Sequence, residues 1–290
     1  MTSIRQPLPD RSRRGDRGAA HLALVVLGVL SAFPCPALAE GFGPGHVGDD
    51  GWLPSAALPT GAGAWEAALG GGYAPGFVPP FRAAERTRTS FGVGGRWMPD
   101  RRVQLSLAFD GLWDRTPAGS EVGPGDVRLG AAAWLVDPGP IRLWLGWSAK
   151  LPDASDEGEL GTDETDITFG TAVEAHHDDF RILGGVGLQI LGNPLRFANQ
   201  DDVPALRLAG SWTPGRLATG VALNADLGTS RNPARITAGA WARGGVPIGV
   251  LHGFIELGGG AGLSAAAPDG FVTLGIGFGA KGEAADPRAR

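Results

Sequence analysis

The stretch from Ile141 to His176 alternates apolar with polar or small residues in two runs, which are separated by an acidic loop. Successive side chains of a β-strand point to opposite faces, so each run predicts a strand with one apolar and one mostly polar face. An antiparallel register that pairs Lys150 with Asp166 also brings Arg142 opposite a carboxylate, Glu174. Each such pair contributes about 0.2–1 kcal/mol. The stretch therefore predicts a hairpin whose charges share one face.

The same alternation recurs along the chain in about twelve segments, most of which approach the length that a tilted strand needs to cross a bilayer. The segments are residues 62–74, 88–97, 102–113, 126–136, 141–151, 166–177, 180–191, 204–213, 216–227, 234–243, 248–260 and 270–279. Their connections alternate between short ones (98–101, 137–140, 178–179, 214–215, 244–247) and longer ones (75–87, 114–125, 152–165, 192–203, 228–233, 261–269). Transmembrane barrels have short periplasmic turns and longer external loops. We therefore predict an all-β fold, a transmembrane antiparallel up-and-down β-barrel of about 12 strands, in preference to a secreted sandwich.

The chain begins like a secretory signal, with five arginines followed by an apolar run and a small-x-small site that ends at Ala39. We predict a cleaved signal peptide (1–39), a periplasmic N-terminal lead or plug (40–61), an outer-membrane barrel (62–279) and a periplasmic C-terminal tail (280–290). Cleavage would remove the single cysteine, Cys35, and would take the formal charge from −5 to −8. Such an acidic chain argues against nucleic acid as a partner. The expected partners are membrane lipid, lipopolysaccharide, the barrel-assembly machinery and a small solute.

Charged residues on the predicted inward face are the candidate functional residues. They are Asp110, Asp126, Arg128, Arg142, Lys150, Asp166, Glu174, Arg181, Arg207, Arg216, Asp226, Arg235 and Arg243. The six placed on a solute path are Arg142, Lys150, Asp166, Glu174, Arg181 and Arg207. Such charges can select solutes in a pore, or they can close the lumen through mutual salt bridges. Trp134, Trp144 and Trp241 share this inward phase and would narrow the interior, whereas Trp97, Trp113 and Trp212 fall at strand ends on the apolar face.

Two features suggest other chemistry. Barrel lipid hydrolases use a serine and a histidine on the barrel wall, and here Glu174 and His176 share a face. No serine nucleophile stands out on a neighbouring strand, so we expect no enzyme activity. The acidic loop 152–165 offers oxygen ligands for a cation, yet its spacing does not match an EF-hand, and a solvated external loop is the simpler interpretation. No cofactor or metal site is expected.

Three short motifs lie in and around the hairpin: Gly125-Asp126-Val127, Lys150-Leu151-Pro152 and Leu160-Gly161-Thr162-Asp163, followed by Asp166. Together they resemble motifs of an outer-membrane family named for the meta-pathway of phenol degradation. The resemblance covers residues 125–195, with Asp153-Ala154 in place of the usual Thr-Gly and Asp163 in place of a common Gly. It implies a barrel with a transport role for aromatic or hydrophobic compounds, and it implies no catalytic residues.

The sequence thus predicts an outer-membrane channel for small solutes in a bacterium with two membranes. The main alternative is a closed structural or surface-binding barrel without transport, and the third is a barrel lipid hydrolase. We also expect the exchange of Arg142 with Glu174 to be tolerated better than either single change, and additive damage would refute the register.

Overall fold

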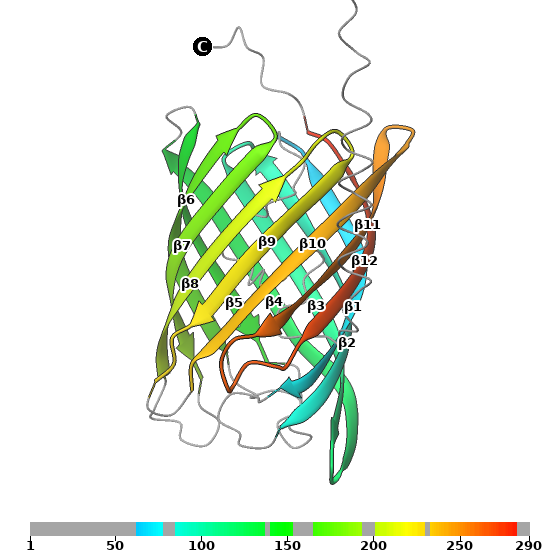
Figure 1. The fold of residues 1–290 in the computed structure, drawn as a ribbon. Helices are drawn as coiled ribbons and strands as arrows, with labels where there is room; N and C mark the ends of the chain where they lie inside the picture. The colour runs from blue at the N-terminus through cyan, green and yellow to red at the C-terminus, as the bar shows by residue number, and fades with distance from the viewer. Residues whose placement is uncertain are drawn as a thin grey trace, which may run out of the picture. The chain divides into compact units, whose positions relative to one another are not determined.

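The computed structural model describes residues 62–77, 85–136, 140–152, 165–192, 201–229 and 233–282. These residues form an antiparallel barrel that closes because β1 pairs with both β2 and β12 (Figure 1). The strands are β1 (Trp65–Phe77), β2 (Arg86–Asp100), β3 (Val103–Thr116), β4 (Gly119–Val136), β5 (Ile141–Leu151), β6 (Asp166–His177), β7 (Phe180–Leu191), β8 (Asp201–Trp212), β9 (Leu217–Asp226), β10 (Arg235–Ile248), β11 (Leu251–Gly262) and β12 (Phe271–Ala280). The predicted antiparallel barrel of about 12 strands is confirmed. The predicted signal peptide and lead, and most of the acidic loop, lie outside the described residues.

The opening hairpin has the predicted register. Residues of β5 and β6 pair so that Lys150 lies opposite Asp166 and Arg142 lies opposite Glu174. The predicted strands 141–151, 166–177 and 180–191 match β5, β6 and β7 residue for residue. Period-two patterning therefore placed this part of the sheet correctly, because one apolar and one polar face leave no freedom to slip by one residue.

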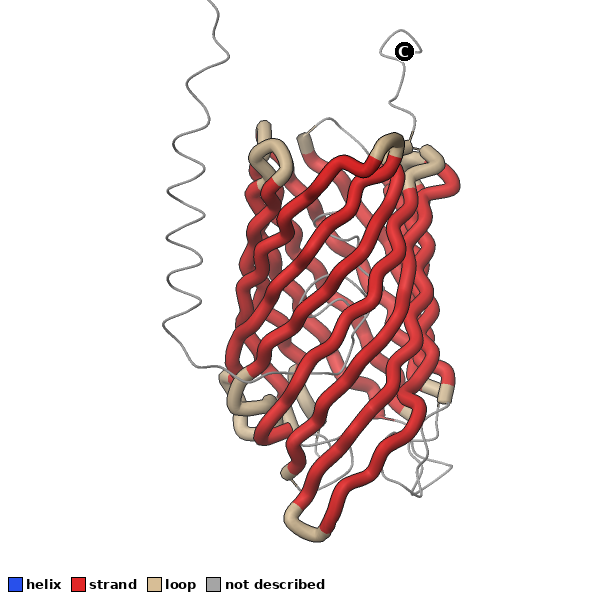
Figure 2. Tube along the Cα trace, turned by 90° about the vertical axis from the view of Figure 1, so that its right-hand side faces the viewer, coloured by secondary structure: helices blue, strands red, loops and turns tan. Residues whose placement is uncertain are grey.

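Two predicted connections are wrong. Residues 114–125 do not form a long loop, because β3 continues to Thr116 and β4 begins at Gly119, with Thr116 Oγ1 accepting from Ala118 N at 3.2 Å to hold the turn. Pairing of β4 with β5 starts only at Val127, so this hairpin projects beyond its neighbours (Figure 2). The predicted turn at 244–247 belongs to β10, and the chain reverses later, at Gly249.

The β2–β3, β6–β7, β8–β9 and β10–β11 turns lie together at one end of the barrel, which we call the short-turn end. Three of these turns contain a residue with a positive φ angle: Asp178 (49°), Gly215 (65°) and Gly249 (64°). Glycine adopts this conformation without a Cβ clash, and aspartate tolerates it better than most residues. The tight reversals between β6 and β7, β8 and β9, and β10 and β11 follow from these residues.

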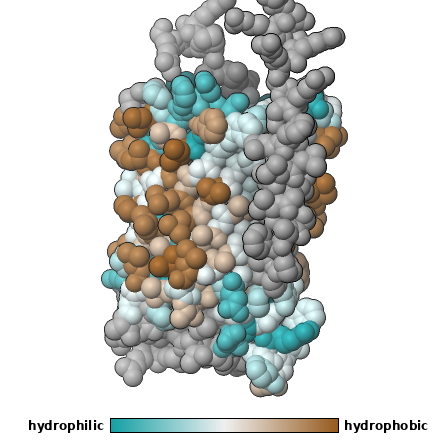
Figure 3. Space-filling view, viewed as in Figure 1, coloured by the Kyte–Doolittle hydropathy of each residue, from teal (hydrophilic) through white to brown (hydrophobic). Residues whose placement is uncertain are grey.

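The outward face of the barrel is apolar. Large apolar side chains remain exposed along every second position, as Figure 3 shows on the wall in view, while hydrophilic residues gather towards the ends. Aromatic residues lie near strand ends, where Phe180 stacks on Trp212 at 6.0 Å between ring centroids and Trp65 meets Phe278 edge-on at 5.7 Å. An apolar band with aromatic residues near its edges is the surface of a barrel that faces lipid.

Glycines on the inner face accommodate aromatic rings of neighbouring strands. A Cβ atom on Gly277 would lie 2.5 Å from the Phe254 ring and 2.6 Å from Ala68 Cβ, and one on Gly220 would lie 2.6 Å from Trp241. The rings therefore lie flat against strands that have no side chain beneath them.

Replacing Gly277 by alanine is expected to destabilise the barrel by about 1–3 kcal/mol, because the added methyl group would force the Phe254 ring into the lumen. Gly275 lies two residues away on the same face, and its Cβ would meet only ordinary contacts at 3.8 Å. Gly275→Ala is therefore the matched control. Denaturant titration of both variants measures the difference, and equal midpoints would contradict the close packing.

Candidate functional site

The inner face of the barrel carries the charged residues. Asp110, Asp126, Glu174, Arg207 and Arg243 are buried, and Arg128, Arg142, Lys150, Asp166, Arg181, Asp226 and Arg235 are largely enclosed, as their predicted inward phase requires. Arg216 was placed inward incorrectly: it lies exposed on the turn before β9. Among the residues that the structure describes, sequence reasoning missed seven further buried charges, namely Glu66, Arg86, Arg88, Arg96, Asp114, Asp201 and Glu256. Most of these residues occupy the alternate strand positions whose side chains point into the barrel. Applying this alternation to every strand could have found them.

Glu174 is the centre of one cluster at the short-turn end. It accepts hydrogen bonds from Arg142 Nη1 at 3.0 Å, Arg181 Nη2 at 2.6 Å and Trp144 Nε1 at 2.8 Å, and it is 1% exposed. The guanidinium of Arg142 also lies 4.1 Å from the ring centroid of Trp134. We call Arg142, Trp144, Glu174 and Arg181 the Glu174 cluster. A buried carboxylate with three donors, two of them charged, is held firmly in place.

Exchanging Arg142 with Glu174 is expected to be as damaging as the more harmful single change. The register alone predicted better tolerance of the exchange, but the exchange would bring an arginine at position 174 against Arg181 and would remove the acceptor of Trp144. Denaturant midpoints of the two single variants and the double variant measure this outcome. Clear recovery in the double variant would show that Arg181 and Trp144 contribute little.

A second cluster joins strands from both ends of the chain. Arg243 on β10 donates through Nε to Glu256 on β11 and through Nη1 to Glu66 on β1, both at 2.8 Å, and Arg96 on β2 meets Glu66 at 3.3 Å. We call Glu66, Arg96, Arg243 and Glu256 the seam cluster. The side chain of Arg243 reaches Glu66 across β12, whose inward-facing residues at this level include Gly277. The cluster therefore bridges the β1–β12 seam, where the barrel closes. The guanidinium of Arg243 also lies 3.9 Å from the Phe254 ring centroid.

Ion pairs continue towards the opposite end. Lys150 Nζ lies 2.6 Å from Asp166 and 3.4 Å from Asp126, and Arg128 pairs with Asp110 on β3. Between β8 and β9, Arg207 Nη2 lies 2.8 Å from Asp226. Asp226 also accepts a hydrogen bond from Gln189 at 3.1 Å. These pairs join neighbouring strands and keep opposite charges side by side.

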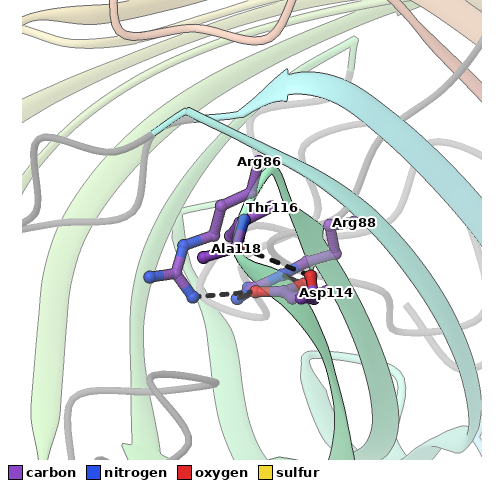
Figure 4. A network of polar contacts seen from close by, with 6 residues as sticks. Arg86, Arg88, Asp114, Thr116 and Ala118 are labelled. Atoms are coloured by element: carbon purple, nitrogen blue, oxygen red, sulfur yellow. Dashed lines mark hydrogen bonds and ion pairs between the residues drawn. The ribbon is translucent and has the colours of Figure 1, made fainter.

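The mouth opposite the short-turn end carries two arginines on one carboxylate (Figure 4). Arg88 donates to both oxygens of Asp114 at 2.7 Å, and Arg86 Nη1 lies 3.6 Å from the same carboxylate. Asp114 lies at the base of the projecting β3–β4 hairpin, in the stretch that was predicted to be a loop. Its bidentate pairing fixes the last part of β3 against β2.

An apolar cluster lies beside the Glu174 cluster on the inner wall. It consists of Ala132, Trp144, Ala172 and Leu183, with Trp134 and Ala209 packed against it, and the two tryptophan rings meet edge-on at 5.0 Å between centroids. Trp134 and Trp144 therefore fill part of the interior, as their predicted inward phase indicated. Trp241 is likewise buried, whereas Trp97 and Trp113 are exposed on the outward face.

The described residues around His176 do not form a hydrolase site. This residue pairs across the ladder with Arg181, as predicted, but Glu174 is engaged by its three donors rather than by the imidazole. Within the described ranges, no group of three or more His, Cys, Asp or Glu side chains could hold a metal ion. The same part of the chain contains no helix long and apolar enough to cross a membrane.

The closed sheet, its apolar outer band and its charged interior define a transmembrane-type β-barrel. No family model and no curated protein matches the sequence, so the resemblance to the phenol meta-pathway family stays a prediction. The fold is similar to an outer membrane channel from Pseudomonas putida F1, with a TM-score of 0.54, 15% identity and coverage of 81% of this chain and 98% of that one. It is also similar to the translocator domain of the autotransporter NalP from Neisseria meningitidis, with a TM-score of 0.50, 12% identity and coverage of 91% and 97%. At these identities, the comparisons establish a shared barrel fold.

Proposed function

We propose that this protein is an outer-membrane channel through which small solutes pass. The observation that carries the proposal is the lining: charged side chains follow the inner wall from Arg88 and Asp114 at the mouth to Glu66 and Arg96 at the short-turn end. A wall that only had to pack would be filled by apolar residues, whereas a water-filled path is lined by polar ones. The outer membrane channel of Pseudomonas putida F1, whose fold is similar, supports this proposal.

Export through a cleaved signal peptide, contact with lipopolysaccharide and insertion by the barrel-assembly machinery are parts of the same proposal. The short motifs shared with the phenol meta-pathway family favour aromatic or hydrophobic solutes. Trp134, which is only partly buried on the inner wall, would offer such solutes an apolar contact surface. The six residues Arg142, Lys150, Asp166, Glu174, Arg181 and Arg207 remain our candidates for the solute path.

A sealed structural or surface-binding barrel is the second candidate. It is favoured by the burial of Glu66, Gln104 and Glu174, each at most 2% exposed, which indicates that the short-turn end is densely filled. Buried ion pairs can satisfy each other without any transport role. The two candidates differ in one measurable property, which is whether the folded barrel lets solutes through.

Solute flux into liposomes containing the purified, refolded protein tests the proposal. Ions, sugars and aromatic acids would be compared, with protein-free liposomes as the background. Flux of any of these classes above that background is the expected result. A folded, heat-modifiable barrel that admits none of them would exclude the channel and favour the sealed barrel.

A further inference from the structure

We propose that the Glu174 cluster and the seam cluster form a selectivity filter that passes small uncharged solutes in preference to ions. This inference rests on the proposed channel function and adds the place and the basis of selection. Both clusters lie at the short-turn end, since Glu66, Arg142 and Arg181 are each the second residue of a strand that starts there. Five strands separate β5 from β11 in either direction around the ring, so the two clusters face each other across the barrel.

Opposite charges in the filter alternate along the wall. Arg142 and Arg181 reach Glu174 from the strands on either side, and Arg243 joins Glu256 to Glu66 along the opposite arc. Among the described residues, the ion pairs of these two clusters all run along one wall and none crosses between the two arcs. Ion-selective pores instead present a ring of one sign to the permeating ion.

The net charge of the filter is small. Its charged members are four arginines and three glutamates, which leaves a formal charge of +1 on the Glu174 cluster and none on the seam cluster. Alternating charges a few ångströms apart cancel each other's field at the centre of the lumen. An ion entering this layer would lose hydration water without meeting a compensating charge, whereas an uncharged solute would not bear that cost.

Aromatic rings hold two of the four arginines in place. Arg142 lies over Trp134 and Arg243 over Phe254, with 4.1 Å and 3.9 Å from guanidinium carbon to ring centroid. An arginine that is stacked on a ring and bound to a carboxylate cannot swing out to accompany an anion through the layer. What it offers instead is a flat face and fixed hydrogen-bond donors, to which hydroxyl and carbonyl groups of uncharged organic solutes can bind.

Selectivity of the full-length protein can be measured with matched probes. In planar bilayers under a KCl gradient, the chloride-to-potassium permeability ratio is expected to lie within about threefold of one, because paired charges leave little net field. In liposomes, glucose is expected to enter faster than glucuronate or glucosamine, which are similar in size but charged. A strong preference for either ion, or faster entry of a charged sugar, would overturn the filter but not the channel. If the protein conducts no ionic current in the bilayers and admits no sugar into the liposomes, both the channel function and the filter are overturned.

Two variants locate the filter. Glu174→Gln raises the formal charge of the layer to +2 and is expected to shift permeability towards chloride by about threefold or more, since it leaves two arginines without their shared carboxylate. Arg142→Gln lowers that charge and is expected to shift permeability towards potassium, and it keeps Arg181 and Trp144 on Glu174 should the first variant fail to fold. The control is Arg101→Gln, at an exposed residue on the β2–β3 turn of the same end. If folded Arg142→Gln shows the selectivity of the wild type, the filter lies elsewhere and the proposal is wrong.

Discussion

Replacing Arg243 by methionine is expected to lower the free energy of unfolding by about 3–5 kcal/mol, which is the usual effect of removing one partner from a buried ion pair. Arg243 holds Glu66 and Glu256 at 2.8 Å each, and these carboxylates are only 2% and 6% exposed. Without the guanidinium, Glu66 would keep its contact with Arg96 at 3.3 Å, whereas Glu256 would lose the arginine that lies 2.8 Å from it. Denaturant titration in lipid vesicles, followed by tryptophan fluorescence, measures the loss.

Two further variants separate charge from packing. Adding Glu256→Gln to Arg243→Met removes one of the two buried carboxylates that Arg243 neutralised and keeps Glu66 paired with Arg96, so this double variant should be more stable than Arg243→Met alone. Arg216→Met is the matched control, because Arg216 is exposed on a turn at the same end. If Arg243→Met unfolds at the same denaturant concentration as Arg216→Met, the seam cluster does not stabilise the barrel.

Replacing Val93 by arginine is expected to impair assembly and to cost about 2–4 kcal/mol, the range for an arginine that faces lipid near the middle of the bilayer. Val93 is the central residue of β2, it points outward at 48% exposure, and it pairs with Leu69 and Phe109 on the neighbouring strands. The yield of heat-modifiable barrel in vesicles and the unfolding midpoint report the effect.

Val250→Arg is the matched control for this second substitution. Val250 lies in the β10–β11 turn and is 94% exposed, so the same change in volume and charge occurs beyond the strands. We expect its assembly and stability to equal those of the wild type. Equal behaviour of Val93→Arg and Val250→Arg would mean that the outer face of β2 is not in contact with lipid.

The strands were predictable because two-residue periodicity is a local property of the chain. The alternation gave the correct first and last residues of β5, β6 and β7, and it placed the ends of most other strands within a few residues. Charge pairing fixed the β5–β6 register. Loop lengths were less informative. The stretch 114–125, rich in glycine and charge, reads as a loop, yet its backbone pairs in a hairpin whose tip is held by Thr116.

The candidate site was only partly predictable. The pairing of Arg142 with Glu174 followed from the register. The hydrogen bonds that Arg181 and Trp144 also donate to Glu174 depend on how far these side chains extend across the sheet. The contact of Arg243 with Glu66 was beyond any local pattern, because it passes over β12 and needs a glycine-lined path. Charges near strand ends, such as Arg86 and Asp114, were missed since the predicted strands stopped short of them or placed them in loops.

The seam cluster also affects how the protein folds and unfolds in time. Arg243 and Glu66 are 177 residues apart, so their contact can form only after the first and the last strands have met. Contacts of such long range are made late, and those absent from the transition state slow unfolding more than they speed folding. Once β1 and β12 have joined, the cluster therefore acts as a kinetic lock, and loss of Arg243 should appear chiefly as a faster rate of barrel opening.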